Sequence, residues 1–155
     1  MKQILDQIDR RILDIAQRNG ALSQRDLAEQ VGLSQNALWR RLKRLEEDGI
    51  LLGTRRRISA ERLGLDLTVF VMVRTRNHSD DWIESFRAHV ARIPQVVEMH
   101  RIGGEWDYML KVVTHGMAGY DRVYKRLTKG IELETVTGMF SMETMLEDRP
   151  LDVFE

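Results

Sequence analysis

Polar and basic side chains with DNA-reading chemistry gather on one face of a predicted helix over residues 34–49. Its other face carries Leu38, Leu42 and Leu45 at i, i+4 and i+7, the spacing of a buried stripe. Arg and Lys pair with guanine edges, and Asn and Gln pair with adenine edges. The pattern therefore predicts a helix that enters a major groove through Gln35, Asn36, Trp39, Arg40, Lys43 and Arg44.

A second predicted helix and a tight turn position this surface. Ser23 is a suitable N-cap for a helix that ends at Gly32, where glycine accepts the left-handed conformation. Ser34 then caps the basic helix, which ends at Gly49. This arrangement is typical of a helix-turn-helix. The alternative is an ordinary pair of antiparallel helices whose charges are merely solvated.

The segments on either side complete a predicted winged domain over residues 1–58. A helix over 4–18 places Ile4, Ile8, Ile12 and Ile15 on one stripe, and we interpret Asp9-Arg10-Arg11 as a solvated face with a capping role. After Gly49, Gly53-Thr54 predicts a small hairpin, or wing, whose arginines lie near phosphates or a minor groove unless they are only solvated. The candidate DNA-binding residues are Ser34, Gln35, Asn36, Trp39, Arg40, Lys43, Arg44, Arg55, Arg56 and Arg57.

The pattern changes after a linker at residues 59–66. Strands are predicted at 65–75, 96–102, 108–114 and 135–146, and amphipathic helices follow the first and third. The order β-α-β-β-α-β is typical of a ferredoxin-like domain over 67–155, within an α+β protein. We expect a mixed sheet with both helices on one face. Because Phe70 and Met72 make the other face apolar as well, we expect a homodimer through this sheet.

The two predicted parts of the chain differ in net charge. Residues 1–60 carry 12 Lys and Arg against 8 Asp and Glu, a net charge of +4, and the remainder carries 12 against 16, a net charge of −4. A basic first part suits a DNA partner. There is no cysteine, apolar leader or apolar run long enough to span a membrane, so we expect a cytoplasmic protein with no membrane partner.

The loop Gly103-Gly104-Glu105-Trp106-Asp107 is the candidate site for a small effector. Glycine N–H groups accept the close approach of a carboxylate, an acidic side chain pairs with an ammonium group, and an indole covers an apolar side chain. The alternative is a hairpin turn that needs glycine only for its backbone. The four histidines show no metal-ligand spacing, and no catalytic constellation is present, so we expect no metal, no cofactor and no enzyme.

The chain resembles the Lrp/AsnC (feast/famine) family of bacterial and archaeal regulators. The matching residues run from Ile8 to Leu13, through Leu27-Ala28, Val31 to Ser34, Arg41-Leu42 and Leu45-Glu46, to Leu63-Gly64 and Gly103 to Tyr108. The resemblance implies an effector-sensing C-terminal domain and dimers that assemble further, often to octamers. It also implies an amino-acid effector bound between dimers, with the effector region on the Gly103–Asp107 loop and the last strand. It also places a family arginine at Arg41, for which we expect a structural role with Glu46 or acidic residues of the first helix.

Two details bear on the effector. The family often has tyrosine at the position of Trp106, whereas Trp39 and the loop Asn77-His78-Ser79 resemble a branch that senses cysteine. We therefore expect a sequence-specific transcriptional regulator whose activity is modulated by an amino acid, with cysteine as one candidate. The alternatives are a nucleoid-associated architectural protein with little sequence preference, and an enzyme or metabolite-binding module built on the ferredoxin-like domain.

Overall fold

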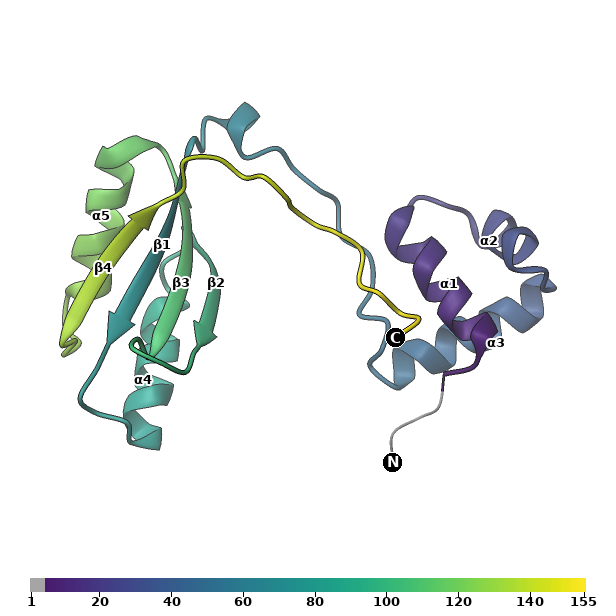
Figure 1. The fold of residues 1–155 in the computed structure, drawn as a ribbon, viewed down its shortest axis with the longest axis horizontal. Coiled ribbons are helices and arrows are strands. Elements are labelled where there is room, and N and C mark those ends of the chain that lie inside the picture. Colours follow the sequence, from purple (N-terminus) through teal and green to yellow (C-terminus); the bar gives the residue numbers. More distant parts are fainter. Residues whose placement is uncertain (1–4) are drawn as a thin grey trace. The chain divides into compact units, whose positions relative to one another are not determined.

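The computed structural model describes residues 5–155, so Ile4 and the other residues of 1–4 in the predicted first domain lie outside the described residues. The chain forms two compact units, shown in Figure 1. One comprises the chain up to Arg57 together with residues 146–155, and the other comprises residues 58–145. None of the helices among residues 5–155 has the length and apolar character needed to cross a bilayer.

Three helices build the first unit: α1 (Gln7–Arg18), α2 (Gln24–Val31) and α3 (Gln35–Glu47). Ser23 and Ser34 cap α2 and α3 by accepting bonds from backbone N–H groups three residues on, and Gly32 is left-handed, as predicted. The apolar stripes meet in one core. Its buried members are Ile12, Leu13, Leu27, Ala28, Val31, Leu38 and Leu45.

The predicted wing hairpin is not formed. Residues 51–59 have no regular secondary structure, and no strand is assigned between α3 and β1 in the described chain. Only Gly53, Thr54 and three arginines lie between Leu52 and Ile58, which are 90% and 75% exposed. The two arms therefore offer few apolar side chains that could stabilise a hairpin. The linker continues through a short 3-10 helix, η1 (Glu61–Leu63).

The second unit has the predicted element order: β1 (Leu67–Arg74), α4 (Asp80–Val90), β2 (Val96–Arg101), β3 (Tyr108–Thr114), α5 (Gly116–Thr128) and β4 (Thr135–Phe140). The strand order is β2-β3-β1-β4. Every neighbouring pair is antiparallel, so the expectation of a mixed sheet was wrong. The parallel strands β1 and β2 are separated by β3 and never pair.

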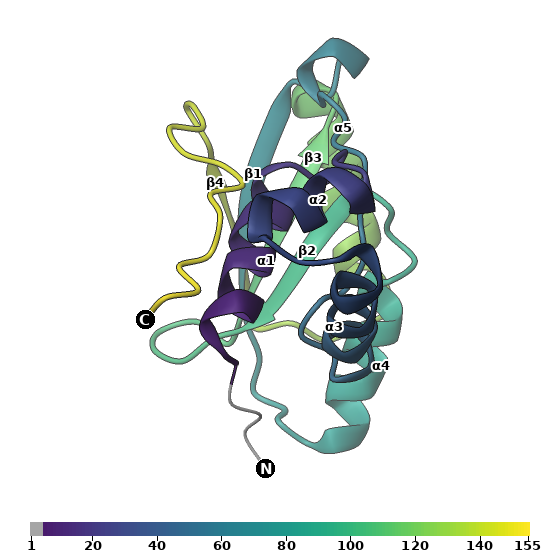
Figure 2. The same cartoon turned by 90° about the vertical axis from the view of Figure 1, so that its right-hand side faces the viewer.

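Both helices pack on one face of this sheet, which Figure 2 shows from a second direction. Val69, Val71 and Val73 of β1 are fully buried against Phe86 of α4 and Val123 of α5. The alternation of buried and half-buried residues along β1 is the pattern expected of a sheet with one covered face.

The last strand is shorter than predicted, ending at Phe140 rather than residue 146. Ser141 still donates its N–H to the carbonyl of Thr68, one residue into β1, but β1 offers few further partners beyond that point. The predicted second domain also ran to residue 155, whereas residues 146–155 group with the first unit. There, Gln17 exchanges two hydrogen bonds with the backbone of Leu151 (2.8 and 2.9 Å), and Val153 packs against the three-helix core.

Candidate DNA-binding and effector-binding sites

A buried carboxylate fixes the basic helix α3 on α1. Asp9 is 1% exposed. Its two oxygens accept hydrogen bonds from Arg41 (2.8 Å) and Arg44 (2.6 Å) of α3, and Asp6 accepts a further bond from Arg41 (2.6 Å). Asp6 and Asp9 also form a capping box, in which each side chain accepts a bond from the backbone N–H of the other. The ion pairs therefore set the rotation of α3 about its own axis.

These contacts change the interpretation of three predicted residues. Asp9 was expected on a solvated face but is buried, although its capping role is present. Arg41 has the expected structural role, with Asp6 and Asp9 rather than Glu46 as its partners. Arg44, predicted to contact DNA, is held by Asp9 in the structure.

Ionisation of this cluster follows from the same contacts. The backbone N–H of Asp9 and the guanidinium of Arg41 lower the pKa of Asp6 below its ordinary value. Hydrogen bonds to Asp6 and Asp9 raise the pKa of Arg41. Both partners are thus held in their charged forms.

The opposite face of α3 is open. Gln35, Asn36 and Arg40 are exposed, and none of their side chains forms a hydrogen bond or ion pair with residues 5–155. Trp39 is 51% exposed, with the ammonium group of Lys43 lying 5.3 Å from its ring centroid. Among the described residues, the one other contact of Lys43 is a long ion pair with Glu47, at 3.7 Å. Ser34 is occupied as the N-cap of the helix. An exposed row of amide, aromatic and basic side chains is suited to base edges and phosphates.

The three consecutive arginines after α3 differ from one another. Arg55 and Arg56 are exposed and have no ionic partner among the described residues. Arg57 pairs with Asp148 at 2.8 Å and lies 3.8 Å from Glu147, both in the C-terminal segment. Two of the three guanidinium groups are therefore available to phosphate.

The candidate effector loop lies between β2 and β3. Gly104 has a φ of 122°, and a Cβ atom at either glycine would meet nothing within 4 Å, so the backbone is open to a ligand. The three side chains, however, already have partners. Asp107 accepts a bond from the N–H of Thr75 (2.8 Å), Glu105 pairs with Arg74 (3.2 Å), and the guanidinium of Arg74 lies 5.0 Å from the Trp106 ring centroid.

A cavity near this loop was not predicted from the sequence. It is lined by residues 75–78, Trp82, Glu132 and Glu134. Trp82 was expected only on the buried stripe of its helix and His78 only at the surface. The lining residues come from two separate regions of the chain, residues 75–82 and 132–134, and spacing along the sequence contains no signal for their convergence. Elsewhere, no three metal-ligating side chains come together in the part of the chain that the structure describes.

The fold and the two surfaces define a class of protein: a DNA-binding regulator that carries a separate ligand-binding domain. Comparison with known families gives the same division. Residues 5–51 match the winged helix-turn-helix DNA-binding family, and residues 68–151 match the Lrp/AsnC ligand binding domain. The chain belongs to the Lrp/AsnC family of transcriptional regulators and not to a family of enzymes.

Named relatives and solved structures cover nearly the whole chain. The DNA-binding transcriptional activator DecR of Escherichia coli K12 is 43% identical over 90% of this chain and 93% of its own length. The glutamate uptake regulatory protein of Zymomonas mobilis is 39% identical over 91% of this chain and 86% of its own.

Two crystal structures are similar in fold and sequence. An AsnC family regulator from Agrobacterium tumefaciens is 39% identical and superposes with a TM-score of 0.87, covering 92% of this chain and 93% of its own. A transcriptional regulator from Neisseria meningitidis, solved as a complex with L-Met, is 31% identical, with a TM-score of 0.88 and 96% of both chains covered. The protein is thus a ligand-responsive DNA-binding regulator.

Proposed function

We propose that this protein binds specific DNA sequences through the outer face of α3 and that a free amino acid modulates this binding. The observation that carries the proposal is the division of α3 into two faces. The inner face is fixed by Asp9, whereas the outer face presents side chains that have no role in holding the fold together. A rigidly placed helix with an open polar face is what reading base edges requires.

We assign different roles to the predicted DNA-binding residues. Base reading falls to Gln35, Asn36, Trp39, Arg40 and Lys43, the exposed set. Arg55 and Arg56 supply phosphate contacts. Arg44 and Arg57 act through their intramolecular ion pairs, and Ser34 acts as the helix cap. Since few phosphates are neutralised by one copy, two copies acting together increase the affinity.

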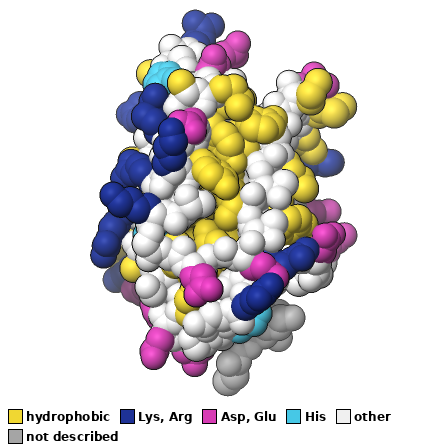
Figure 3. Space-filling view, turned by 90° about the vertical axis from the view of Figure 1, so that its left-hand side faces the viewer, with side chains coloured by type: hydrophobic (Ala, Val, Ile, Leu, Met, Phe, Trp, Pro, Cys, Tyr) yellow, Lys and Arg dark blue, Asp and Glu magenta, His cyan; other side chains and the backbone are white. Residues whose placement is uncertain are grey.

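A second copy also explains the open face of the sheet. In the ladders, Phe70 lies opposite Met139 and Met72 lies opposite Met109. Paired residues share a face, so these four side chains line the surface away from the helices. Figure 3 shows exposed hydrophobic side chains gathered on one face of this unit. We propose a homodimer through this sheet, assembling further to an octamer, with two α3 helices acting on DNA in a bacterial cytoplasm.

The amino-acid effector is supported by one structural neighbour, solved with L-Met, and by the open backbone at Gly103 and Gly104. We propose that these glycine N–H groups receive the effector carboxylate. Glu105, Trp106 and Asp107 shape the loop through their contacts with β1 and the residue after it. Neither the names of the relatives nor the geometry singles out cysteine.

Substitution of Arg40 and Lys43 by alanine tests the DNA-binding face. Each change should weaken binding on the order of tenfold, and loss of a phosphate contact should reduce the salt slope by about one. The control is Arg87→Ala on α4, which removes one positive charge from the second unit. It should leave the DNA affinity and the salt slope unchanged. Unaltered affinity and salt slope in both α3 variants would show that this face does not contact DNA.

A further inference from the structure

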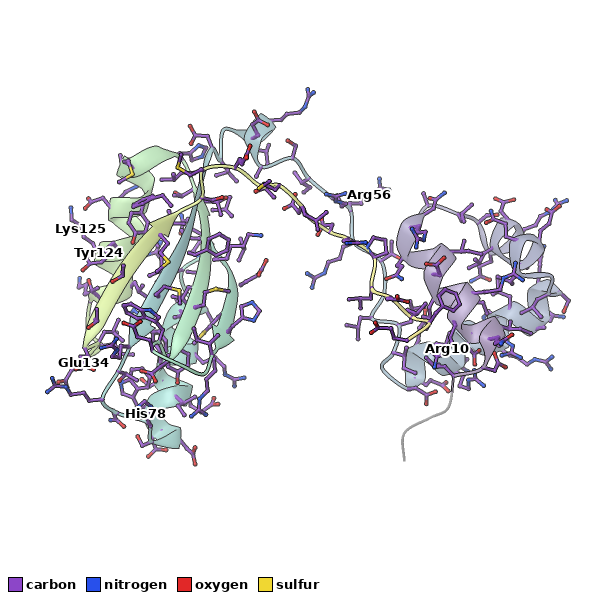
Figure 4. The ribbon with its side chains drawn as sticks, viewed as in Figure 1. Arg10, Arg56, His78, Tyr124, Lys125 and Glu134 are labelled. Atoms are coloured by element: carbon purple, nitrogen blue, oxygen red, sulfur yellow. The ribbon has the colours of Figure 1, made fainter. Side chains whose placement is uncertain are left out.

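Four basic residues on the helices of the second unit have no role in the sites described above. Arg92 follows the C-terminal end of α4, Arg122 and Arg126 lie one turn apart on α5, and Lys129 is the C-cap residue of α5. All four are exposed, and we call them the basic ridge. Figure 4 shows the neighbouring Lys125 on α5, at the outer edge of this unit.

Charge in the second unit is unevenly distributed. Residues 58–145 carry 11 Lys and Arg against 12 Asp and Glu, a net charge of −1. Segments 84–92 and 121–129 hold 6 of the cations and 2 of the acids, a net charge of +4, which leaves 5 against 10, or −5, for the rest of the unit. Both acids of these segments are paired there, Glu84 with Arg87 and Asp121 with Lys125. The excess positive charge is therefore that of the basic ridge.

Hydrogen bonds join the two helices at the ridge. The Nε2–H of His89 on α4 donates to the carbonyl groups of Arg126 and Leu127, both at 3.0 Å. The guanidinium of Arg126 donates to the carbonyl of Arg92 at 2.8 Å. The backbone that presents the basic side chains is thus fixed before any ligand binds, which lowers the entropic cost of binding.

Cations near a helix C-terminus also serve the helix itself, because they offset its unpaired carbonyl groups. In α5, His89 already occupies two of these carbonyl groups. The side chains of Arg92, Arg122 and Lys129 form no hydrogen bond or ion pair with residues 5–155. These three groups are therefore available to an external anion.

The length and chemistry of the ridge suit a chain of phosphates. From Arg122 to Lys129, α5 rises about 10 Å, a length over which one strand of DNA presents about three phosphates. Guanidinium groups bind phosphate through paired N–H donors, and an ammonium group binds it as a point charge.

We propose that the basic ridge binds the phosphate backbone of double-stranded DNA, as a second contact surface separate from α3. The helix-turn-helix brings DNA to the chain, so the ridge meets DNA that is already tethered. The homodimer proposed above covers the opposite face of the sheet and leaves the ridge open. The inference rests on DNA binding by the chain, and it requires neither base reading by α3 nor an amino-acid effector.

Titration of the full-length protein with a random-sequence duplex of about four helical turns, over a range of salt concentrations, tests the ridge. In the double variant Arg122→Gln/Lys129→Gln, we expect the salt slope to fall by about two, since each lost phosphate contact removes about 0.9. Affinity at low salt should fall on the order of tenfold, and Lys129→Gln alone should remove about one from the slope. The preference for specific over random DNA should not change, because phosphate contacts carry no sequence information.

The matched control is Arg87→Gln/Lys125→Gln, which removes two cations of the same helices that already have carboxylate partners. It should leave both affinity and salt slope nearly unchanged. An unaltered salt slope in the ridge variant, or an equal loss in the ridge and control variants, would overturn the proposal.

The variants of α3 separate this proposal from the proposed function. If Arg40→Ala weakens DNA binding and the ridge variant does not, the ridge proposal fails and the proposed function stands. If the ridge variant lowers the salt slope and Arg40→Ala and Lys43→Ala have no effect, the ridge binds DNA and the assignment of base reading to α3 fails.

Discussion

Substitution of Asp9 by alanine should destabilise the DNA-binding unit strongly. The change removes the acceptor for two guanidinium groups, at 2.8 and 2.6 Å, and the acceptor for one backbone N–H at the start of α1. Loss of a buried ion-pair partner costs about 3–5 kcal/mol when the remaining charge has no access to water. Here, the side chains of Arg41 and Arg44 are 26% and 45% exposed, so water recovers part of that cost.

We therefore expect a loss of about 2–3 kcal/mol in the free energy of unfolding. For a unit of this size, 1 kcal/mol corresponds to roughly 4–8 °C in Tm, which predicts a fall of about 10–20 °C in the transition of this unit. Circular dichroism at 222 nm of the full chain follows the helical signal, and calorimetry separates the transitions if the two units melt apart.

The control is Asp14→Ala on the same helix. Asp14 pairs with Arg18 at 2.8 Å near the surface, and such pairs contribute less than about 1 kcal/mol. The reasoning is refuted if Asp9→Ala lowers Tm by no more than Asp14→Ala does. In that case, the buried ion pairs would not hold α3 in place.

Three further changes test other parts of the structure. Gly138→Ala places a Cβ atom 2.4 Å from the Tyr120 hydroxyl and should cost about 1–3 kcal/mol, whereas Gly103→Ala meets open space and should be near neutral in the same melts. Val153→Asp puts a charge against the three-helix core. It should lower the Tm of the first unit by several degrees and leave the Tm of the second unit unchanged. Equal shifts in both units would argue against packing of the C-terminal segment on the three-helix core. The pKa of Asp6 is lower in the folded state than in the unfolded state. Ionised Asp6 therefore makes its full contribution to the free energy of unfolding above about pH 4, and this contribution is lost as the pH falls through the folded pKa. Asp6→Asn should therefore flatten the decline of Tm below pH 4, and an unchanged slope would contradict this.

Local patterns predicted the elements well. The leucine stripe of α3, the serine caps, the left-handed Gly32 and the alternation in β1 all depend on neighbours along the chain, and the structure has each of them. The pairing of strands depends on residues far apart. For this reason, three features could not be predicted from the sequence: the fully antiparallel sheet, the early end of β4 and the absence of the wing hairpin.

The same distinction applies to the sites. Exposure of Gln35, Asn36 and Arg40 followed from the helical period. Burial of Asp9 did not, because an acidic residue in a charged stretch is usually solvated. The Asp-x-x-Asp spacing of the capping box was the one local signal of its position. Convergence of Trp82 and Glu132 at one cavity has no sequence signal, since it arises from the antiparallel pairing of β1 with β4, which brings the end of β1 beside the start of β4.

Fluorescence anisotropy measures most directly whether the chain reads DNA sequence and answers to an amino acid. The labelled DNA is the segment immediately upstream of its own gene, compared with a scrambled segment of the same length and composition at fixed salt, with and without each amino acid. We predict binding at least on the order of a hundredfold tighter to the native segment, changed severalfold by one amino acid or a few related ones. Equal affinity for both DNAs, unaltered by every amino acid, would contradict the function proposed for this protein and favour a DNA-packaging role.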